Sequence, residues 1–445
     1  MRGPGSLAAL AGGCLGLAAL SLLAPSAPGY DAWAWLVWGR EVAGLELNTE
    51  AGPAWKPLPV LVTTALAPLG EAAPWLWLLV ARAGGLLAVV LAFRLAFRLA
   101  AGRASWLAGA AAAVGLLAVV GFARGVWLGS SEGLLMAICL LAFERHLDGR
   151  RGQALALGLA AGLLRPEVWP FLGAYGVVVW RNAPGLRPLV AAAPAVVAAA
   201  WFLPELWGSG ELLRSSERAR IPNPGQPALA AHPALEVMRR FALMAPAPLL
   251  CGAAVGAASI RRGPVLAVAA GGTAWLAIVA LMSEAGYSGE ERYLLPAAAC
   301  ACVLGGLGLA RVASLLPRRA VPVAAAASLA AALAVGVPRA AELGRALEWD
   351  ARLARDLGAA VERAGGAERL RRCGAPVAGR YRFPLVAWRI EVPIAALTLD
   401  PARAGVVYRS RLTRGAPAEP DARSLPRLGA AGAWDVLGTC PEPSS

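Results

Sequence analysis

The sequence predicts an all-α polytopic membrane domain, residues 1–338, followed by a small extracytoplasmic α/β domain, residues 339–445. Three observations lead to this fold class. Of the 445 residues, 58% are hydrophobic and 16% are charged, whereas soluble domains average about 45–50% and about 25%. The apolar residues form runs that suit helices of about 20 residues crossing roughly 30 Å of hydrocarbon. The formal charge of +14 comes from arginines clustered between these runs, which is typical of membrane topology and not of a nucleic-acid partner.

The apolar runs predict about eleven transmembrane helices. In chain order these are 6–24, 73–100, 105–122, 130–147, 153–164, 168–180, 186–203, 241–260, 265–282, 293–310 and 320–338. The fifth and sixth are short. A cleaved signal peptide is the alternative for the first run, because small residues follow it, although Pro25 and Pro28 suit cleavage poorly.

The arginine clusters predict a plasma-membrane protein with a cytoplasmic amino terminus, because every cluster then lies in a cytoplasmic turn. The clusters are Arg94, Arg98 and Arg103; Arg145, Arg150 and Arg151; Arg181 and Arg187; Arg261 and Arg262; and Arg311, Arg318 and Arg319. Among the acids of the membrane domain, only Glu144 and Asp148 then face the cytoplasm. An odd number of spans puts the carboxyl-terminal domain outside, where Cys373 and Cys440 are expected to form a disulfide.

The first outer loop, residues 25–72, predicts two helices that lie in the headgroup layer. Asp31 stands at the outer end of the first span, and three tryptophans follow it within seven residues, which suits an interfacial helix. Asp31 is either a general base or a cap of that helix. Glu41 is expected to be a solvated acid. Lys56 opens the second apolar stretch and either pairs with a phosphate or snorkels to water.

Three later outer positions also carry charge. Glu132 opens the fourth span and either belongs to an N-cap box or contacts a substrate. Arg165 and Glu167 interrupt the apolar stretch between the fifth and sixth spans, where charge is costly and therefore a functional candidate. Arg292 lies at the last outer turn and either anchors the span or binds an anionic headgroup.

The tail predicts one helix and then short strands. Apolar residues recur at helical spacing at Leu343, Leu347, Leu353, Leu357 and Val361. Three runs separated by Pro and Gly, residues 383–392, 395–399 and 405–408, predict strands.

The order of these parts resembles the GT-C superfamily of integral membrane glycosyltransferases. The resemblance rests on Tyr-Asp at the end of the first span, the Trp-rich helix, Lys-Pro-Leu-Pro, and Glu-Arg-Tyr-Leu-Leu-Pro entering a late span. It is closest to the protein-mannosyltransferase and aminoarabinose-transferase type of actinobacterial cell envelopes. The second acid that many members carry beside the first is Ala32 here, and the second proline of the lysine element is displaced to Pro59.

The resemblance implies transfer of a sugar, such as a mannosyl or arabinosyl group, from a polyprenyl-phosphate donor. The acceptor would be a glycan or protein of the cell envelope on the outer face, and direct displacement would invert the anomeric centre. Asp31 would be the catalytic base, and Lys56, Arg165 and Arg292 would bind the donor phosphate. The candidates for substrate binding are Glu132, Glu167, Glu291 and Tyr293.

Two further expectations concern cofactors and alternative functions. No protein metal site is expected, because the two histidines, His146 and His232, are far apart in the sequence; a divalent cation stays open as a cofactor. The main alternative function is a transporter or flippase for a lipid-linked or small polar substrate, with Arg165 and Glu167 lining its path. The third function considered is a scaffold whose outer domain binds partners.

Overall fold

The computed structural model of the protein describes residues 4–100, 104–260, 262–315, 317, 320–400, 405–411, 416–421 and 424–440. Arg103, Arg261, Arg318 and Arg319 of the predicted basic turns lie outside these residues. The chain forms two compact units. Unit 1 comprises Met1–Leu20, Leu79–Ala200 and Ser216–Ala341, and unit 2 comprises Ser21–Leu78, Trp201–Ser215 and Glu342–Ser445.

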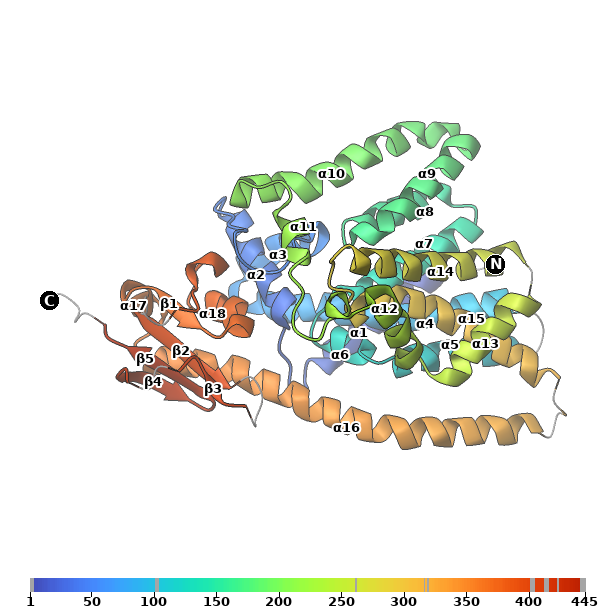
Figure 1. Ribbon diagram of the computed structural model, residues 1–445. Helices are drawn as coiled ribbons and strands as arrows, with labels where there is room; N and C mark the ends of the chain where they lie inside the picture. The colour runs from blue at the N-terminus through green and yellow to red at the C-terminus, as the bar shows by residue number, and fades with distance from the viewer. Residues whose placement is uncertain are drawn as a thin grey trace. The chain divides into compact units, whose positions relative to one another are not determined.

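Unit 1 is helical, and its centre is α15 (Leu295–Ala313), which packs against α5, α13 and α14 (Figure 1). Small residues permit this packing. A Cβ added at Gly308 would lie 1.8 Å from the carbonyl oxygen of Gly252, and one at Gly256 would lie 2.5 Å from that of Leu304. Such close backbone approach is the usual way in which membrane helices associate. The other helices that lie wholly or mostly in this unit are α1 (Pro4–Ser21), α4 (Ala73–Leu99), α5 (Ser105–Ala118), α6 (Phe122–Trp127), α7 (Glu132–Leu147), α8 (Arg151–Gly162), α9 (Trp169–Asn182), α10 (Arg187–Ser209), α12 (Pro233–Met244), α13 (Ala247–Ser259) and α14 (Gly263–Glu284). The end of α10, from Trp201 on, belongs to unit 2.

Ion pairs join the carboxyl-terminal ends of α4 and α7. Arg94 contacts Glu144 at 2.5 Å, and Arg98 contacts Asp148 at 2.6 Å. Glu144 and Asp148 are the acids that the sequence assigns to the cytoplasmic face, and their partners belong to the predicted basic turns. Glu132, by contrast, opens α7, about 18 Å along the helix axis from Glu144. The Arg94–Glu144 pair and Glu132 therefore lie at opposite ends of α7, as expected if the predicted topology holds.

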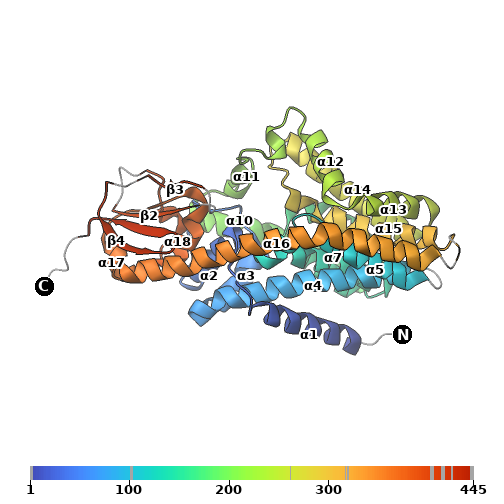
Figure 2. The ribbon, with the colours of Figure 1, turned by 90° about the horizontal axis from the view of Figure 1, so that it is seen from below.

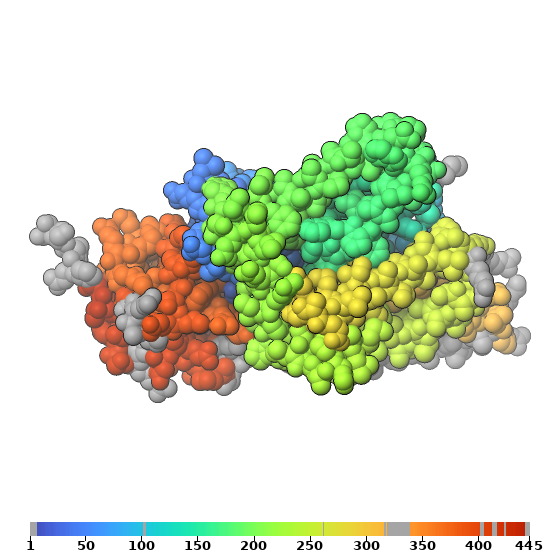
Figure 3. Space-filling view, turned by 45° about the horizontal axis from the view of Figure 1, so that its top comes forward, coloured from blue at the N-terminus to red at the C-terminus, as the bar shows by residue number. Residues whose placement is uncertain are grey.

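Within the part of the chain that the structure describes, four helices are long and apolar enough to cross a membrane: Pro57–Leu99, Pro184–Ser209, Gly263–Glu284 and Glu291–Ala313. A fifth span arises if α12 and α13, bent by 103° at their junction, are taken together. The predicted count of about eleven stays a prediction, because α5, α8 and α9 have 14, 12 and 14 residues and so extend only about 18–21 Å. Exposed leucines on α12 and α14, whose surface Figure 3 shows in yellow-green and yellow, suit contact with lipid: Leu235, Leu243 and Leu281.

Unit 2 contains the two helices predicted in the first outer loop. They are α2 (Tyr30–Ala43) and α3 (Pro57–Leu66), and α2 packs against both α3 and α18 (Phe383–Arg389) of the tail. Gly39 permits the contact with α3, because a Cβ there would lie 2.5 Å from Thr63 Oγ1 and 2.6 Å from the Thr63 carbonyl carbon. On the other side, Arg40 donates to the carbonyls of Trp388 and Val392 at 3.3 and 3.1 Å.

The tail forms a mixed sheet in the order β1-β2-β5-β4, with β3 beside β2. The strands are β1 (Pro376–Ala378), β2 (Val406–Arg411), β3 (Ala418–Glu419), β4 (Arg427–Ala431) and β5 (Trp434–Gly438), and α17 (Ala367–Arg372) precedes them. β1 and β2 are parallel, whereas β2–β5 and β4–β5 are antiparallel. Strand β2 contains residues 406–408 of the predicted run 405–408.

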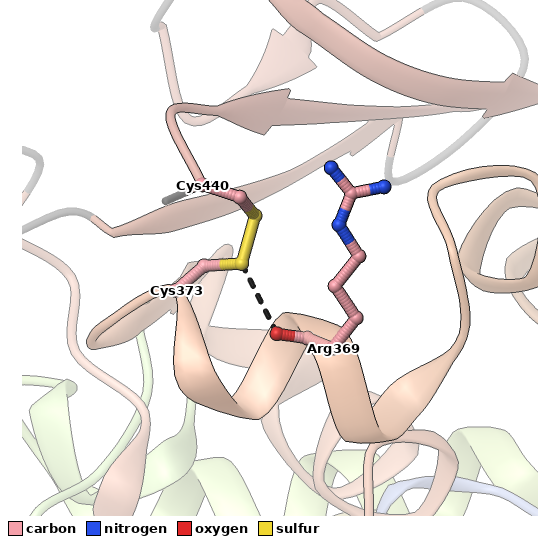
Figure 4. The surroundings of a disulfide bond; sticks show 3 residues. All are labelled: Arg369, Cys373 and Cys440. Atoms are coloured by element: carbon pink, nitrogen blue, oxygen red, sulfur yellow. Dashed lines mark hydrogen bonds between the residues drawn. A yellow bond between two sulfur atoms is a disulfide. The ribbon is translucent and has the colours of Figure 1, made fainter. Parts of the chain in front are cut away.

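The structure contains the predicted disulfide between Cys373, directly after α17, and Cys440, which follows β5 (Figure 4). It closes a loop of sequence separation 67 around the whole sheet. The Cys373 sulfur lies 3.1 Å from the carbonyl oxygen of Arg369, which is a contact and no hydrogen bond, because a disulfide sulfur carries no hydrogen.

Two predictions about the tail are wrong. Residues 383–389 of the run 383–392, predicted as a strand, form helix α18, because Pro384 suits a first helical turn and the helix buries Leu385, Val386 and Trp388. Residues 395–399 give only a short 3-10 turn and one isolated bridge, Val377 with Thr398. Tertiary packing overrides the local β preference of such short apolar runs.

Helix α16 (Ala320–Arg363) is continuous, and Figure 2 shows it as one uninterrupted ribbon. It joins the eleventh predicted span, 320–338, to the predicted amphipathic helix of the tail. Of the apolar positions predicted for that helix, Leu347, Leu353, Leu357 and Val361 are buried. The domain boundary at residue 338 therefore falls inside a helix and stays a prediction about where the chain leaves the membrane.

Candidate functional site

Asp31 lies in the first turn of α2, and the N-cap of that helix is Gly29. The interpretation of Asp31 as the N-cap is therefore wrong. A carboxylate in the first turn still interacts favourably with the helix dipole. Because residues four apart share one face of a helix, Asp31 lies on the same face as Trp35, one turn further on.

Lys56 lies beside that face. Its ammonium is 5.2 Å from the centre of the Trp35 ring, within the range of a cation–π interaction. Lys56 is also the N-cap residue of α3, so the positive end of that helix adds to the charge of the side chain. The fold thus brings the predicted phosphate-binding lysine and the predicted catalytic acid to one region of α2, although 25 positions separate them in the sequence.

Glu41 is not the solvated acid that the sequence predicts. Its side chain is buried, and one carboxylate oxygen accepts the backbone N–H of Asn48 at 3.0 Å. The other oxygen has no hydrogen-bond partner among the described residues. Burial raises the pKa of Glu41 to about 7, because the charged form loses its hydration.

A second group of predicted residues meets in unit 1 around Arg165. The guanidinium of Arg165 contacts Glu167 at 2.5 Å and Glu132 at 3.2 Å, and it stacks 3.7 Å from the centre of the Tyr293 ring. Arg165, Glu132 and Glu167 are all buried. With both acids ionised these three side chains carry a net charge of −1, so the charge of Arg165 is already balanced. The N-cap of α7 is Ser131, which makes no side-chain capping bond, so Glu132 serves the ion pair and no capping box.

Arg292, the residue before Tyr293 in the sequence, also lies close to the ring of that tyrosine. It lies in the 3-10 turn Glu291–Leu294, hydrogen-bonds Glu290, and lies 5.3 Å from the centre of the Tyr293 ring. Its side chain is 32% exposed, so it is the more accessible of the two arginines. Glu291 instead makes a long contact of 3.6 Å with Arg240.

The predicted site residues therefore fall into two sets. Asp31 and Lys56 belong to unit 2, and Glu132, Arg165, Glu167, Glu291, Arg292 and Tyr293 belong to unit 1. Within the described residues, no group of three or more His, Cys, Asp or Glu side chains could hold a metal ion.

Three charged residues that the structure buries are not among the predicted site residues. Glu205 and Arg214 of unit 2 form one pair, and Arg82 of α4 donates to the carbonyl of Trp127 at 3.0 Å in unit 1. A signal was present for Glu205 and Arg82, because each is a lone charge inside a long apolar run.

Comparison with known proteins supports the fold. No protein-family model matches the chain, and no curated protein matches it in sequence. Among solved structures it is similar to ArnT from Cupriavidus metallidurans bound to undecaprenyl phosphate, with a TM-score of 0.55 and 15% identity over 98% of this chain and 98% of that chain. The predicted resemblance to a GT-C membrane glycosyltransferase is thus confirmed at the level of the fold.

Proposed function

We propose that the protein transfers a sugar from a polyprenyl-phosphate donor to a cell-envelope acceptor on the outer face of the membrane. The observation that carries the proposal is the placement of Lys56 on the Trp35 ring, one turn from Asp31 on α2. A base and a phosphate-binding cation are the two groups that this reaction needs. The similarity in fold to ArnT, a protein whose structure holds undecaprenyl phosphate, supports the lipid phosphate as the leaving group.

In the proposed reaction an acceptor hydroxyl attacks the anomeric carbon while Asp31 takes the hydroxyl proton. The bond from that carbon to the phosphate oxygen breaks, and its electron pair leaves with the polyprenyl phosphate. Lys56 would stabilise the negative charge that develops on the phosphate, and Arg292 is the proposed phosphate-binding residue of unit 1. A single displacement of this kind inverts the anomeric centre.

Arg165 is expected to contribute less to phosphate binding than Lys56 and Arg292. Because two carboxylates, Glu132 and Glu167, already balance its charge, its attraction for a phosphate is smaller than that of Arg292, whose ion pair is with one carboxylate, Glu290. We propose that the two carboxylates contact sugar or acceptor hydroxyls and that Arg165 orients them. Tyr293, stacked with both arginines, and Glu291 complete the proposed substrate-binding set.

The test is transfer of radiolabelled sugar from a short-chain polyprenyl-phosphate donor to envelope membranes by the purified protein. Asp31→Asn should lower kcat about 100-fold or more, which is the usual contribution of a general base. The matched control is Glu50→Gln, an exposed acid in the same loop, which should transfer at the parent rate. Parent-level transfer by Asp31→Asn would remove Asp31 as the base. Solute movement into proteoliposomes without covalent product would favour a transporter instead.

A further inference from the structure

The segment that leads to Lys56 is held by a buried carboxylate and a buried guanidinium. Glu205, near the end of α10, is 0% exposed, and Arg214, the first residue of α11 (Arg214–Ala219), is 7% exposed. They form an ion pair of 3.8 Å. Both belong to unit 2, as does the whole of the loop between α2 and α3, residues 44–56.

Arg214 hydrogen-bonds the backbone of this segment directly, whereas Glu205 is connected to it through the hydroxyl of Ser215. Arg214 donates from Nη1 to the carbonyl of Pro53 at 2.7 Å and from Nη2 to that of Gly52 at 3.2 Å. Ser215 accepts the backbone N–H of Trp55 at 2.6 Å and donates to Glu205 Oε1 at 2.5 Å. Two carbonyls and one amide of the backbone just before Lys56 are therefore held by hydrogen bonds.

The loop is also tied at its start and to α2. Thr49 donates its hydroxyl to Glu205 Oε2 at 3.4 Å and its backbone N–H to the Gly208 carbonyl at 3.0 Å. Arg214 lies 5.9 Å from the centre of the Trp38 ring, and that ring packs against Trp55 at 5.6 Å. These contacts connect the loop to the helix that contains Asp31 and Trp35.

A buried ion pair is seldom kept for stability alone, because desolvation of the two charges offsets most of their attraction. Here the buried charges form hydrogen bonds with the backbone carbonyls of Gly52 and Pro53, and such bonds offset the cost of burying polar groups. The benefit is a fixed backbone at the base of a long, flexible lysine side chain, whose ammonium can be placed only if its Cα is placed.

We propose that Glu205, Arg214 and Ser215 are positioning residues that hold Lys56 for the donor phosphate. The inference rests on the proposed function, because the phosphate is the group that Lys56 is to meet. It adds a segment of chain about 150 residues downstream to the donor site, without placing it in contact with substrate.

The chemistry of Lys56 gives a readout that does not need activity. Lys56 is the single lysine of the chain, so an amine-reactive reagent labels it alone apart from the amino-terminal amine, and peptide mapping separates the two. In the parent, buried Lys56 should react slowly. Arg214→Met should raise its labelling rate about tenfold, since loss of a buried hydrogen-bonding partner favours local opening. Undecaprenyl phosphate should slow labelling of the parent and do so less in the variant.

The activity readout separates positioning from folding. Arg214→Met should raise the donor KM about tenfold with a smaller change in kcat, because misplaced binding groups weaken the donor complex. Arg214→Lys, which keeps the charge, should recover part of the loss. Should Arg214→Met fail to fold, Ser215→Ala removes only the bonds to Trp55 and Glu205 and should give the same changes on a smaller scale.

The matched control is Arg94→Met, which breaks the Arg94–Glu144 pair of unit 1, also buried at 11% and 7% exposure. It should lower thermal stability and leave Lys56 labelling and donor KM at parent values. Parent-like labelling and KM in both Arg214→Met and Ser215→Ala would overturn the inference. A parent protein that transfers no sugar from a polyprenyl-phosphate donor would instead remove the proposed function, and the labelling would still decide whether these residues hold Lys56.

Discussion

Each unit stacks a cation on an aromatic ring, but the two units use their carboxylates differently. In unit 1 two buried acids contact Arg165 directly, and its guanidinium lies 3.7 Å from the Tyr293 ring. In unit 2 the buried acid Glu205 bonds Thr49, Ser215 and Arg214, which hold the backbone beside Lys56. The first arrangement balances the charge of the stacked cation, whereas the second fixes the position of the chain that contains it.

The largest expected effect comes from breaking the Arg165 cluster. Arg165→Met leaves Glu132 and Glu167 buried without their common partner and should cost about 3–5 kcal/mol of unfolding free energy. Thermal unfolding of the protein in nanodiscs measures the loss. Adding Glu132→Gln and Glu167→Gln to the variant should restore much of the stability, because the uncompensated charge is then gone. An Arg165→Met protein as stable as the parent would show that the cluster is not the ionic unit described above.

The second largest effect is expected for the pH dependence of stability in unit 2. There Glu41 is a buried acid whose pKa is raised to about 7. The folded protein holds this proton more tightly than the unfolded chain does, so stability should fall as the pH rises from about 4.5 to about 7, by about 3 kcal/mol at most. Glu41→Gln should remove this part of the pH dependence and should be more stable than the parent at pH 8. Unfolding temperatures at pH 5 and pH 8 test it, and equal pH profiles for variant and parent would contradict the prediction.

The contact between α2 and α3 should be sensitive to one methyl group. Gly39→Ala places a Cβ 2.5 Å from Thr63 Oγ1 and 2.6 Å from its carbonyl carbon, so α3 must shift, at a cost of about 1–3 kcal/mol. Because Lys56 caps α3, the variant should also bind undecaprenyl phosphate more weakly. Gly44→Ala is the control, since a Cβ there meets only carbonyl oxygens at 3.6 and 3.7 Å. Equal unfolding temperatures of the two variants would show that α2 and α3 adapt to the added methyl group.

The smallest change in stability is expected at Arg292. Its ion pair with Glu290 is partly exposed, and such pairs contribute at most about 1 kcal/mol. Arg292→Gln should therefore melt near the parent while its donor KM rises, in contrast to Arg165→Met. Steady-state kinetics over a donor series measures this difference, and an unchanged KM would remove Arg292 from the proposed phosphate site.

Much of the fold could be predicted from local sequence. The helices at residues 30–43 and 57–66, the disulfide pair, and the location of Glu144 and Asp148 near the basic turns follow from apolar patterning, cysteine context and the distribution of arginines. Short apolar runs gave the errors: residues 383–392 form a helix because that helix packs against α2. The number of spans stays open, because several helices have only 12 to 14 residues.

By itself the sequence determined the membrane class of the protein, the order of its helices and the polar positions worth suspecting. These depend on the hydrophobicity and period of neighbouring residues, which a linear chain displays directly. Only the tertiary structure decided the environment of each charged group. It pairs Arg165 with Glu132, places Arg214 on the carbonyls of Gly52 and Pro53, and buries Glu41. Pairing across 30 to 160 positions depends on how the helices pack, and packing is a property of the folded chain that no local pattern encodes.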